Sequence, residues 1–391
     1  MPTIAAAFAG LLVIVFAGGC SDVRTWTQPP IESATPIVVE APSPSLHESY
    51  CAWYGDARGG VLYFGESPFW AAMRAAGGDP TADLRISGLQ QIGRMDLDRL
   101  MLLAPLEASG PLGSPARSSV WDVLAHPNGR VYFTTFFETS GVTDPQTGET
   151  WRFDGLGLGL NELFLGPGGS VLATRYGGPA GEAGSVVWFR PDGELIAEHA
   201  LSSAPGIVPA AKSVAYDPSR GQIWVNTDLL AADRSLVGHD VRVLNANGRE
   251  LARWSEPEVE FMTFDAHGNG YLVERSGSRL LLRIVPPGVP GSSAVPQQEG
   301  RVLLLDDDFP SVDFAQDVKP ADDPADRRLV VTRWSGRIHV VDPWADDAHA
   351  VRTLDLPRSS RDALFYTGIL RGGRVCATEC GSIRVVCGSA P

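Results

Sequence analysis

The chain has 391 residues, of which 44% are hydrophobic and 20% charged, with 43 glycines and 30 prolines. This composition excludes an intrinsically disordered chain, a collagen-like repeat and a multi-span membrane protein. The formal net charge is −14, and lysine occurs only at Lys212 and Lys319. An acidic chain with so few lysines is not expected to bind nucleic acid or an anionic membrane surface.

An uncharged apolar stretch, residues 4–19, precedes Cys20. It is short for a membrane span, which needs about 20 residues, and it ends in small residues. We therefore expect residues 1–19 to be a signal peptide. The run AGGC at its end resembles a bacterial lipobox, although no Lys or Arg precedes it and Ala17 stands where Leu is usual. This resemblance implies lipidation of Cys20, with an ordinary secretory signal as the alternative.

The same resemblance implies an outer-membrane lipoprotein that faces the periplasm or the cell surface and touches the membrane through its lipid alone. Residues 20–46 contain several prolines among Ser and Thr, a composition that stays extended. We interpret this segment as a stalk. One short apolar segment, IVVE at residues 37–40, interrupts it.

A polar or glycine-rich turn followed by a β-branched or aromatic strand recurs along the chain. The seven instances are DARGGVLYFGE (56–66), HPNGRVYFTTF (126–136), GPGGSVLATRY (166–176), DPSRGQIWVNT (217–227), DAHGNGYLVER (265–275), PADRRLVVTR (324–333) and LRGGRVCATE (370–379). Their mean spacing of about 52 residues is typical of propeller blades. Further apolar segments and turns flank each instance. We therefore predict that each repeat unit forms four short antiparallel strands.

Such units bury both sheet faces when they are arranged radially, so residues 47–391 predict a single all-β domain, a β-propeller with seven four-stranded blades. Six blades are the alternative. The last unit ends one strand short at the C-terminus. We expect residues 37–40 to supply that strand and close the ring, the alternative being a chance apolar segment in the stalk.

The phrases YDPSRGQIWV (216–225) and FDAHGNGYLV (264–273) resemble the signature of NHL-type and senescence-marker/gluconolactonase-type propellers. This resemblance implies the fold more than a function, because the motif encodes a turn. Gluconolactonase-type propellers are hydrolases that hold a divalent cation on Glu, Asn and Asp. Here GESPFW (65–70) follows the second strand of its unit instead of preceding the first, and no Asn-Asp pair precedes KSVAYDPSRG. No family site residue can be carried over, so an enzyme is not favoured.

Four cysteines remain after Cys20, and an even number in a secreted chain favours disulfides. They are Cys51, Cys376, Cys380 and Cys387. Of the three connectivities, we predict Cys51–Cys380 with Cys376–Cys387, because the first bridge would lock the ring where it closes.

Neither histidines nor acidic runs predict a metal site. The seven histidines lack ligand spacing, and we expect them to be solvated loop residues. Asp306–Asp308 with Asp313, and Asp322–Asp323 with Asp326, lack the spacing of a calcium loop and predict solvated turns. No cofactor is identified, and calcium or another divalent cation stays open as an alternative.

Propeller ligands usually meet the face built from loops that enter the innermost strands and link the second and third strands. The polar residues that open the predicted innermost strands are Asp122, Asn161, Glu162, Lys212, Glu260, Asp317 and Asp362. Ordinary polarity of the channel rim is the alternative interpretation. We expect a non-catalytic, envelope-anchored propeller that binds an envelope protein, a peptide or a glycan through this loop-rich face. The alternative is a metal-dependent lactonase or hydrolase with a divergent site.

Overall fold

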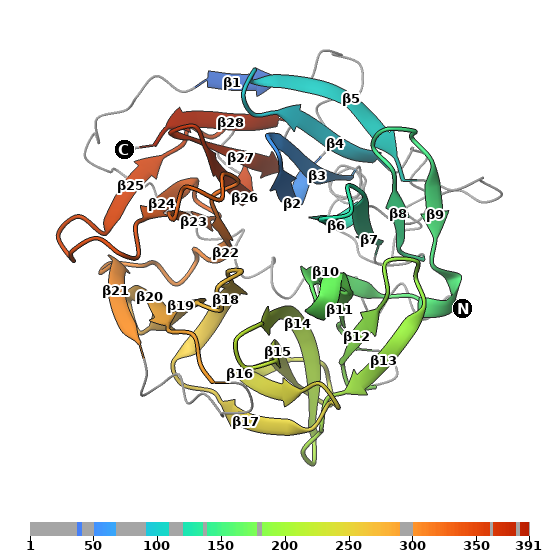
Figure 1. Ribbon diagram of the computed structural model, residues 1–391. Helices are drawn as coiled ribbons and strands as arrows, with labels where there is room; N and C mark the ends of the chain where they lie inside the picture. Colours follow the sequence, from blue (N-terminus) through green and yellow to red (C-terminus); the bar gives the residue numbers. More distant parts are fainter. Residues whose placement is uncertain are drawn as a thin grey trace.

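The structure is a computed structural model, and it describes residues 37–40, 51–67, 91–108, 120–135, 139–177, 182–289, 300–359, 363–380 and 384–390. Seven four-stranded antiparallel blades surround a central axis (Figure 1). This confirms the predicted all-β propeller and its blade number. The helical turns within the described residues are η1 (Asp154–Leu156) and η2 (Pro167–Gly169). No helix in this part of the chain is long and apolar enough to span a membrane.

Each blade has four strands in order from the axis to the rim, and the blades are numbered here by their innermost strands. The innermost strands of blades 1 to 7 are β2 (Cys51–Arg58), β6 (Val120–Ala125), β10 (Leu160–Leu165), β14 (Ile207–Asp217), β18 (Glu258–Phe264), β22 (Ala315–Pro320) and β26 (Leu364–Arg371). The second strands are β3 (Val61–Ser67), β7 (Val131–Thr135), β11 (Val171–Arg175), β15 (Gln222–Ala231), β19 (Gly270–Ser276), β23 (Leu329–Arg333) and β27 (Arg374–Cys380).

The outer strands follow the same order. The third strands are β4 (Gln91–Asp96), β8 (Gly141–Thr143), β12 (Ser185–Phe189), β16 (Leu236–Asn245), β20 (Arg279–Val285), β24 (Arg337–Val341) and β28 (Arg384–Ser389). The fourth strands are β5 (Met101–Glu107), β9 (Thr150–Arg152), β13 (Leu195–Ala200), β17 (Glu250–Trp254), β21 (Arg301–Asp306), β25 (Val351–Asp355) and β1 (Ile37–Glu40).

The repeated phrase of the sequence is the turn between the first and second strands of a blade. In blade 5, Asp265 Oδ1 accepts hydrogen bonds from the N–H groups of His267 and Asn269, both at 2.9 Å. Gly268 has φ +84°, a left-handed conformation that costs glycine little, and a Cβ there would lie 2.5 Å from Ser219 Cβ. The Asp and the Gly of the motif are therefore requirements of the turn itself.

Apolar clusters fill the junctions between neighbouring blades, one cluster at each of the seven junctions. Between blades 4 and 5, for example, the ring centroids of Trp224 and Phe264 lie 5.1 Å apart. Each sheet thus buries both faces, which accounts for the almost fully buried second strands such as β23 and β7.

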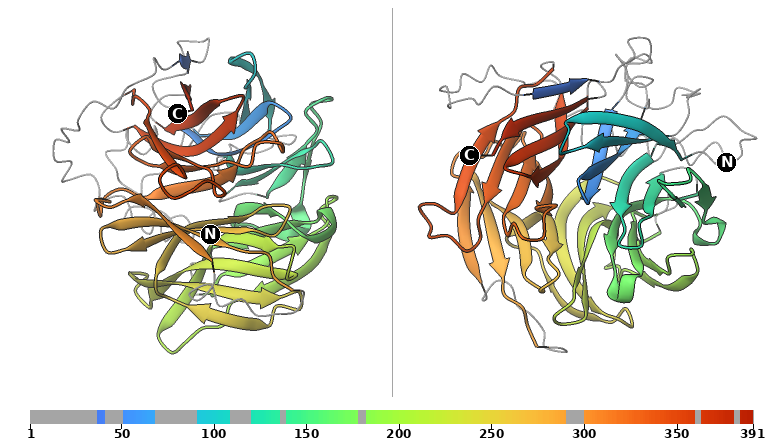
Figure 2. Two further views of the ribbon diagram at one scale, coloured as in Figure 1. Left: turned by 60° about the vertical axis from the view of Figure 1, so that its left-hand side comes forward. Right: turned by 45° about the horizontal axis from the view of Figure 1, so that its top comes forward.

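The ring closes through the N-terminal strand. β1 pairs antiparallel with β28, from Ile37 opposite Cys387 to Glu40 opposite Arg384. It forms the outer edge of the last blade, beside β28 (Figures 1 and 2). This confirms that residues 37–40 supply the fourth strand that the C-terminal unit lacks.

A disulfide lies in the closing blade. Cys376 and Cys387 are bonded across β27 and β28, with their Cα atoms 4.1 Å apart, as predicted. Cys380 is also disulfide-bonded, and Cys51 is its partner in the backbone register between β2 and β27. The Cys51 side chain lies outside the described part of the structure, so the Cys51–Cys380 bridge stays a prediction. Cys20 and the rest of the stalk also lie outside the described residues.

Candidate functional site

Every innermost strand carries a β-bulge at the same level. The register shifts lie between Ala52 and Gly55, Val120 and Val123, Leu160 and Leu163, Ala211 and Ser213, Val259 and Phe261, Ala315 and Asp317, and Phe365 and Gly368. A bulge leaves extra residues outside the ladder and re-aims their side chains. In six of the strands the bulge lies near the start of the strand, so this level is close to the loop-rich face.

The bulged residues form a ring around the channel, which we call the bulge ring. Its members are Trp53, Tyr54, Trp121, Asp122, Asn161, Glu162, Lys212, Glu260, Gln316, Tyr366 and Thr367. Five of the seven predicted ligand-face residues belong to it. Asp317 directly follows Gln316, and Asp362 lies outside the described residues.

Threonines of the second strands hold the bulge ring in place. The Glu162 N–H donates to Thr174 Oγ1 at 3.1 Å, and that hydroxyl donates to the Lys212 carbonyl of the next blade at 3.3 Å. Thr134 and Thr378 repeat this double contact in blades 2 and 7. The bulges free backbone groups from the ladder, and these hydroxyls satisfy them while joining neighbouring blades.

Most carboxylates near the axis are used in the same way. Asp122 Oδ1 accepts the N–H of Val123 at 2.8 Å, and its Oδ2 accepts that of Leu163 in the next blade at 2.7 Å. The Glu260 carboxylate binds the Ala315 N–H of blade 6 and the Arg275 guanidinium. These side chains therefore have a structural role, as ties between blades.

Glu162 differs from these carboxylates. Its residue is only 8% exposed, and within the described structure its carboxylate accepts no hydrogen bond. Burial, and next the charge of Asp122, raise the pKa of Glu162 well above its ordinary value. Unlike Asp122 and Glu260, this side chain therefore does not tie neighbouring blades together.

Both lysines of the chain lie on innermost strands, Lys212 in β14 and Lys319 in β22. Lys319 Nζ lies 3.9 Å from Asp317 Oδ2, and its side chain keeps 25% exposure. Burial alone would lower the pKa of Lys319, but the nearby carboxylates, Asp317 first, raise it. Its electrostatic partners also include Asp122 and Glu162 of blades 2 and 3, so Lys319 acts across the axis.

The remaining channel carboxyls are held partly protonated by burial. Burial raises the pKa of Asp122 to about 7 and that of Asp317 to about 6, although Lys319 acts against both shifts. The channel at the bulge ring therefore holds groups that change charge near neutral pH.

Tyr54 crosses the channel. Its ring lies 6.1 Å from that of Phe261 in blade 5, and its hydroxyl donates to Gln316 Oε1 of blade 6 at 2.8 Å. Trp121 and Tyr366 pack against it, with ring centroids at 5.7 and 5.3 Å. Together they make an aromatic wall beside the charged groups.

Sequence reasoning missed Tyr54, Gln316 and Lys319. The rarity of lysine was the available signal for Lys319, because both lysines of the chain fall on innermost strands. Nothing in the residue pattern showed that Tyr54 and Gln316 would meet across 262 positions of the chain.

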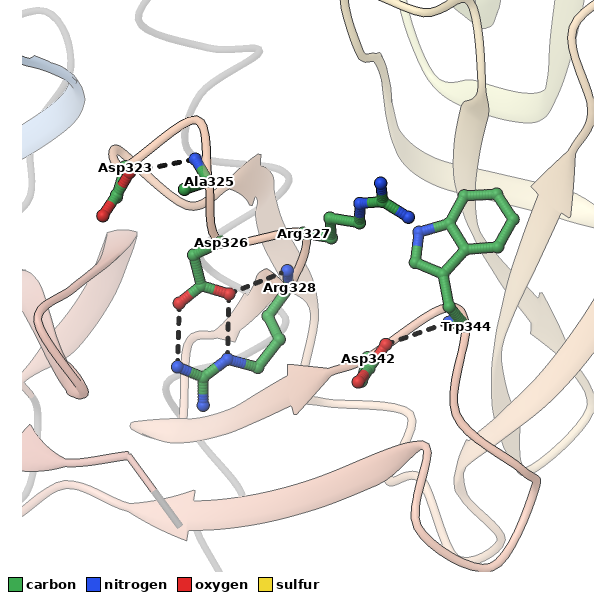
Figure 3. A pocket seen from close by; sticks show the side chains of 7 residues that line it. All are labelled: Asp323, Ala325, Asp326, Arg327, Arg328, Asp342 and Trp344. Atoms are coloured by element: carbon green, nitrogen blue, oxygen red, sulfur yellow. Dashed lines mark hydrogen bonds and ion pairs between the residues drawn. The ribbon is translucent and has the colours of Figure 1, made fainter.

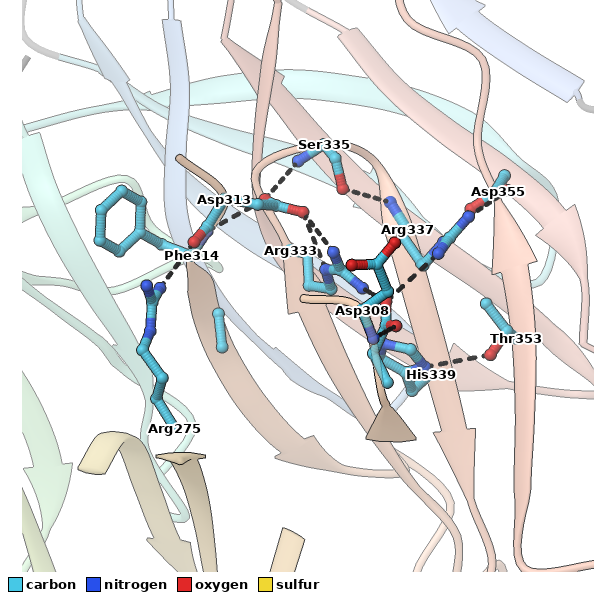
Figure 4. A network of polar contacts seen from close by, with 12 residues as sticks. Arg275, Asp308, Asp313, Phe314, Arg333, Ser335, Arg337, His339, Thr353 and Asp355 are labelled. Carbon is cyan, nitrogen blue, oxygen red and sulfur yellow. Dashed lines mark hydrogen bonds and ion pairs between the residues drawn. The ribbon is translucent and has the colours of Figure 1, made fainter. Parts of the chain in front are cut away.

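Several aspartates of the predicted solvated turns proved to be ion-paired. Arg333 binds both Asp313 and Asp306, and Arg337 bridges Asp306 and Asp355 (Figure 4). Arg371 likewise binds Asp322 at 2.7 Å. The expectation of solvated turns was wrong for Asp306, Asp313 and Asp322, because the compensating arginines lie on other strands. Asp307, Asp308 and Asp323 are exposed, as expected.

The histidines were also not all solvated. His126 and His339 are buried, at 3% and 1% exposure. Burial lowers the pKa of His339 to about 3, so this ring is neutral at physiological pH. Within the described residues, no three His, Cys, Asp or Glu side chains are placed to hold a metal ion.

A shallow depression of about 480 Å³ lies on the opposite face, between the β22–β23 and β24–β25 loops (Figure 3). Arg328 in its lining is paired with Asp326, whereas Arg327 extends toward Trp344, which is 55% exposed. None of the predicted ligand-face residues lines it. We therefore place the candidate site at the bulge ring.

No protein-family model and no curated protein sequence matches the chain. Solved structures do match. A catalytically inactive form of virginiamycin B lyase from Staphylococcus aureus, with quinupristin, superposes with a TM-score of 0.58 at 12% identity, covering 90% of this chain and 98% of that one. YCF48 bound to D1 peptide gives 0.53 at 10% identity, covering 93% and 100%.

Raptor from Chaetomium thermophilum gives a TM-score of 0.57 at 10% identity, and the match covers 92% of this chain but only 29% of Raptor. At these identities the likeness extends to the fold and carries no site residue. By its blades and by these neighbours, the chain is a seven-bladed β-propeller.

Proposed function

We propose that this chain is a non-catalytic β-propeller that binds a protein or peptide through its loop-rich face, held at the cell envelope by a lipid on Cys20. One observation carries the binding role. The bulge ring near this face keeps a buried carboxylate, Glu162, that no contact within the described fold uses. A polar group without a partner in the fold needs an explanation, and ionisable groups with strongly shifted pKa values cluster at functional sites.

The three inner strands of blade 4 extend beyond the bulge ring, and this extension favours a large ligand. β14 pairs with β15 as far as Ile207 opposite Ala231, and β15 pairs with β16 to Leu230 opposite Leu236. At the tip of this extension, Leu236 and Val237 are 44% and 54% exposed. A raised wall with an apolar tip fits a polypeptide better than a small metabolite or a glycan.

A network of polar side chains stiffens this extension. Tyr176 donates to Asp228 Oδ2 at 2.7 Å, and His239 lies between Asp228 at 2.9 Å and Glu258 at 3.1 Å. The wall is therefore preorganised, which lowers the cost of binding. YCF48, a neighbour in fold, is bound to D1 peptide, so the architecture is compatible with this use.

The test places a photo-crosslinking residue at Val237 in the full chain, with a matched position at Trp344 on the opposite face. Irradiation of intact envelopes should give a discrete adduct with a polypeptide from Val237 and none from Trp344. Metal-dependent turnover of a lactone by a monomer without adducts would contradict the proposal and favour the hydrolase alternative.

The envelope anchor has a separate test. Labelling with a clickable fatty acid should mark the wild-type chain and not the Cys20→Ala variant, which should leave the membrane fraction. Equal membrane retention of both chains would contradict the anchor and leave the binding role to be judged on the crosslinks.

A further inference from the structure

We infer that the bulge ring takes a cationic side chain of the bound polypeptide, an arginine or a lysine, with Glu162 as its counter-ion. This inference rests on the proposed function and names the chemistry that the face recognises. Three features of the ring support it: a carboxylate that receives no hydrogen bond, a set of aromatic side chains, and an excess of carboxyl groups over lysines.

The first feature is a hydrogen-bond acceptor that has no donor. Asp122 and Glu260 already receive backbone or guanidinium donors at their carboxylates, whereas Glu162 receives none within the described structure. The residue is 8% exposed, and its carboxyl lies within electrostatic range of Lys319 and Tyr54 from blades 6 and 1, which places it toward the axis. Ammonium or guanidinium N–H groups would supply what this carboxylate lacks.

The aromatic wall suits the same ligand. Tyr54 and Trp121 are only partly buried, although both belong to innermost strands, and their rings pack against each other at 5.7 Å. Aromatic faces attract cations, and the attraction increases where water is excluded. A neutral sugar would also stack on these rings, but it carries no cation for the Glu162 carboxyl.

The charged groups of the channel favour a cation over an anion. Asp56, Asp122, Glu162 and Asp317 all act electrostatically on Lys319, and Lys212 acts on Glu162. Four carboxylates against two ammonium groups leave the site negative when all are ionised, and the chain as a whole carries −14. The two lysines offset only part of this negative charge, and a bound cation would offset more of it.

Proton release provides an independent signature. A cation bound beside Glu162 and Asp122 lowers their raised pKa values, so binding near pH 7 expels protons. Calorimetry in two buffers of different ionisation enthalpy should therefore give different apparent binding enthalpies.

The experiment compares short glycine-serine peptides, acetylated and amidated, that carry one central arginine, citrulline or glutamate. Citrulline keeps the shape of arginine without its charge. With the full chain, the arginine peptide should bind at least about tenfold more tightly than the citrulline peptide. Glu162→Gln should remove this ratio, and Lys212→Met should increase the affinity for arginine. Glu149→Gln, which removes an exposed charge, should leave the ratio unchanged.

Equal binding of the arginine and citrulline peptides, tighter binding of the glutamate peptide, or no binding of any peptide at millimolar concentration would overturn the inference. Thermal melts of each variant separate loss of the site from loss of the fold. The crosslink at Val237 judges the proposed function on its own. If Glu162→Gln still gives the adduct and the ratio of peptide affinities is also unchanged, the cation site is contradicted and the polypeptide-binding role is not.

Discussion

The Tyr54 hydroxyl donates a hydrogen bond to Gln316 Oε1 at 2.8 Å, joining blade 1 to blade 6 across the channel. The two residues are separated by 262 positions in the chain. Because blades 1 and 6 are not neighbours, this bond restrains the ring at its centre, where Tyr54 also packs against the apolar cluster between blades 5 and 6.

Tyr54→Phe should lower the free energy of unfolding by about 1–2 kcal/mol, because it leaves the mostly buried Gln316 oxygen without a donor. Chemical denaturation measures the change. Tyr63→Phe is the matched control, since no partner of the Tyr63 hydroxyl is found in the described structure, and it should change stability little. Equal effects of the two variants would contradict a role for the cross-channel bond.

Thr174→Val should cost about 1–3 kcal/mol, because it leaves both the Glu162 N–H and the Lys212 carbonyl without their hydroxyl partner. Thr227 offers a paired test of opposite sign. It is fully buried, and its hydroxyl has no partner among the described residues. Thr227→Val should therefore be neutral or stabilising. If Thr174→Val proved as harmless as Thr227→Val in urea melts, the threonine contacts between blades would not matter for stability.

Glu66 should make stability depend on pH. Burial raises the pKa of its carboxyl from 4.5 to about 7, so the folded chain holds a proton that the unfolded chain has already lost in this range. Unfolding then releases a proton, and stability falls as pH rises from about 4.5 to 7. Glu66→Gln should remove this dependence, gaining at most roughly 3 kcal/mol at pH 8 and almost nothing at pH 4. Parallel stability curves for variant and wild type, measured over this range, would contradict the shift.

Removal of β1 should open the ring. A chain that begins after Thr35 keeps the strand, whereas one that begins after Pro44 loses its pairing with β28. The longer deletion should cost on the order of 2–4 kcal/mol from lost ladder hydrogen bonds, and it leaves an exposed strand edge that promotes aggregation. Calorimetry and light scattering compare the two chains. Identical melting curves would show that the last blade is stable with three strands.

The architecture of this protein could be predicted from local patterns in its sequence. The recurring turn marks the second strand of every blade, from Val61 in β3 to Val375 in β27. The period, the missing strand at the C-terminus and the apolar residues 37–40 together predicted the ring and its closure. Turns and strand alternation depend on neighbours in the chain, so short segments carry this information.

The site depended on the tertiary structure. Asp122, Glu162 and Lys212 could be selected as polar residues that open innermost strands, but Tyr54, Gln316 and Lys319 could not. A bulge breaks the alternation of side chains, so the face to which Tyr54 points does not follow from its position in β2. Likewise, Asp122 receives a donor from Leu163 of the next blade, whereas Glu162 receives none within the described structure. Residues far apart in the sequence meet only because seven blades close around one axis, and that convergence, which no local pattern encodes, decides which carboxylate has a donor.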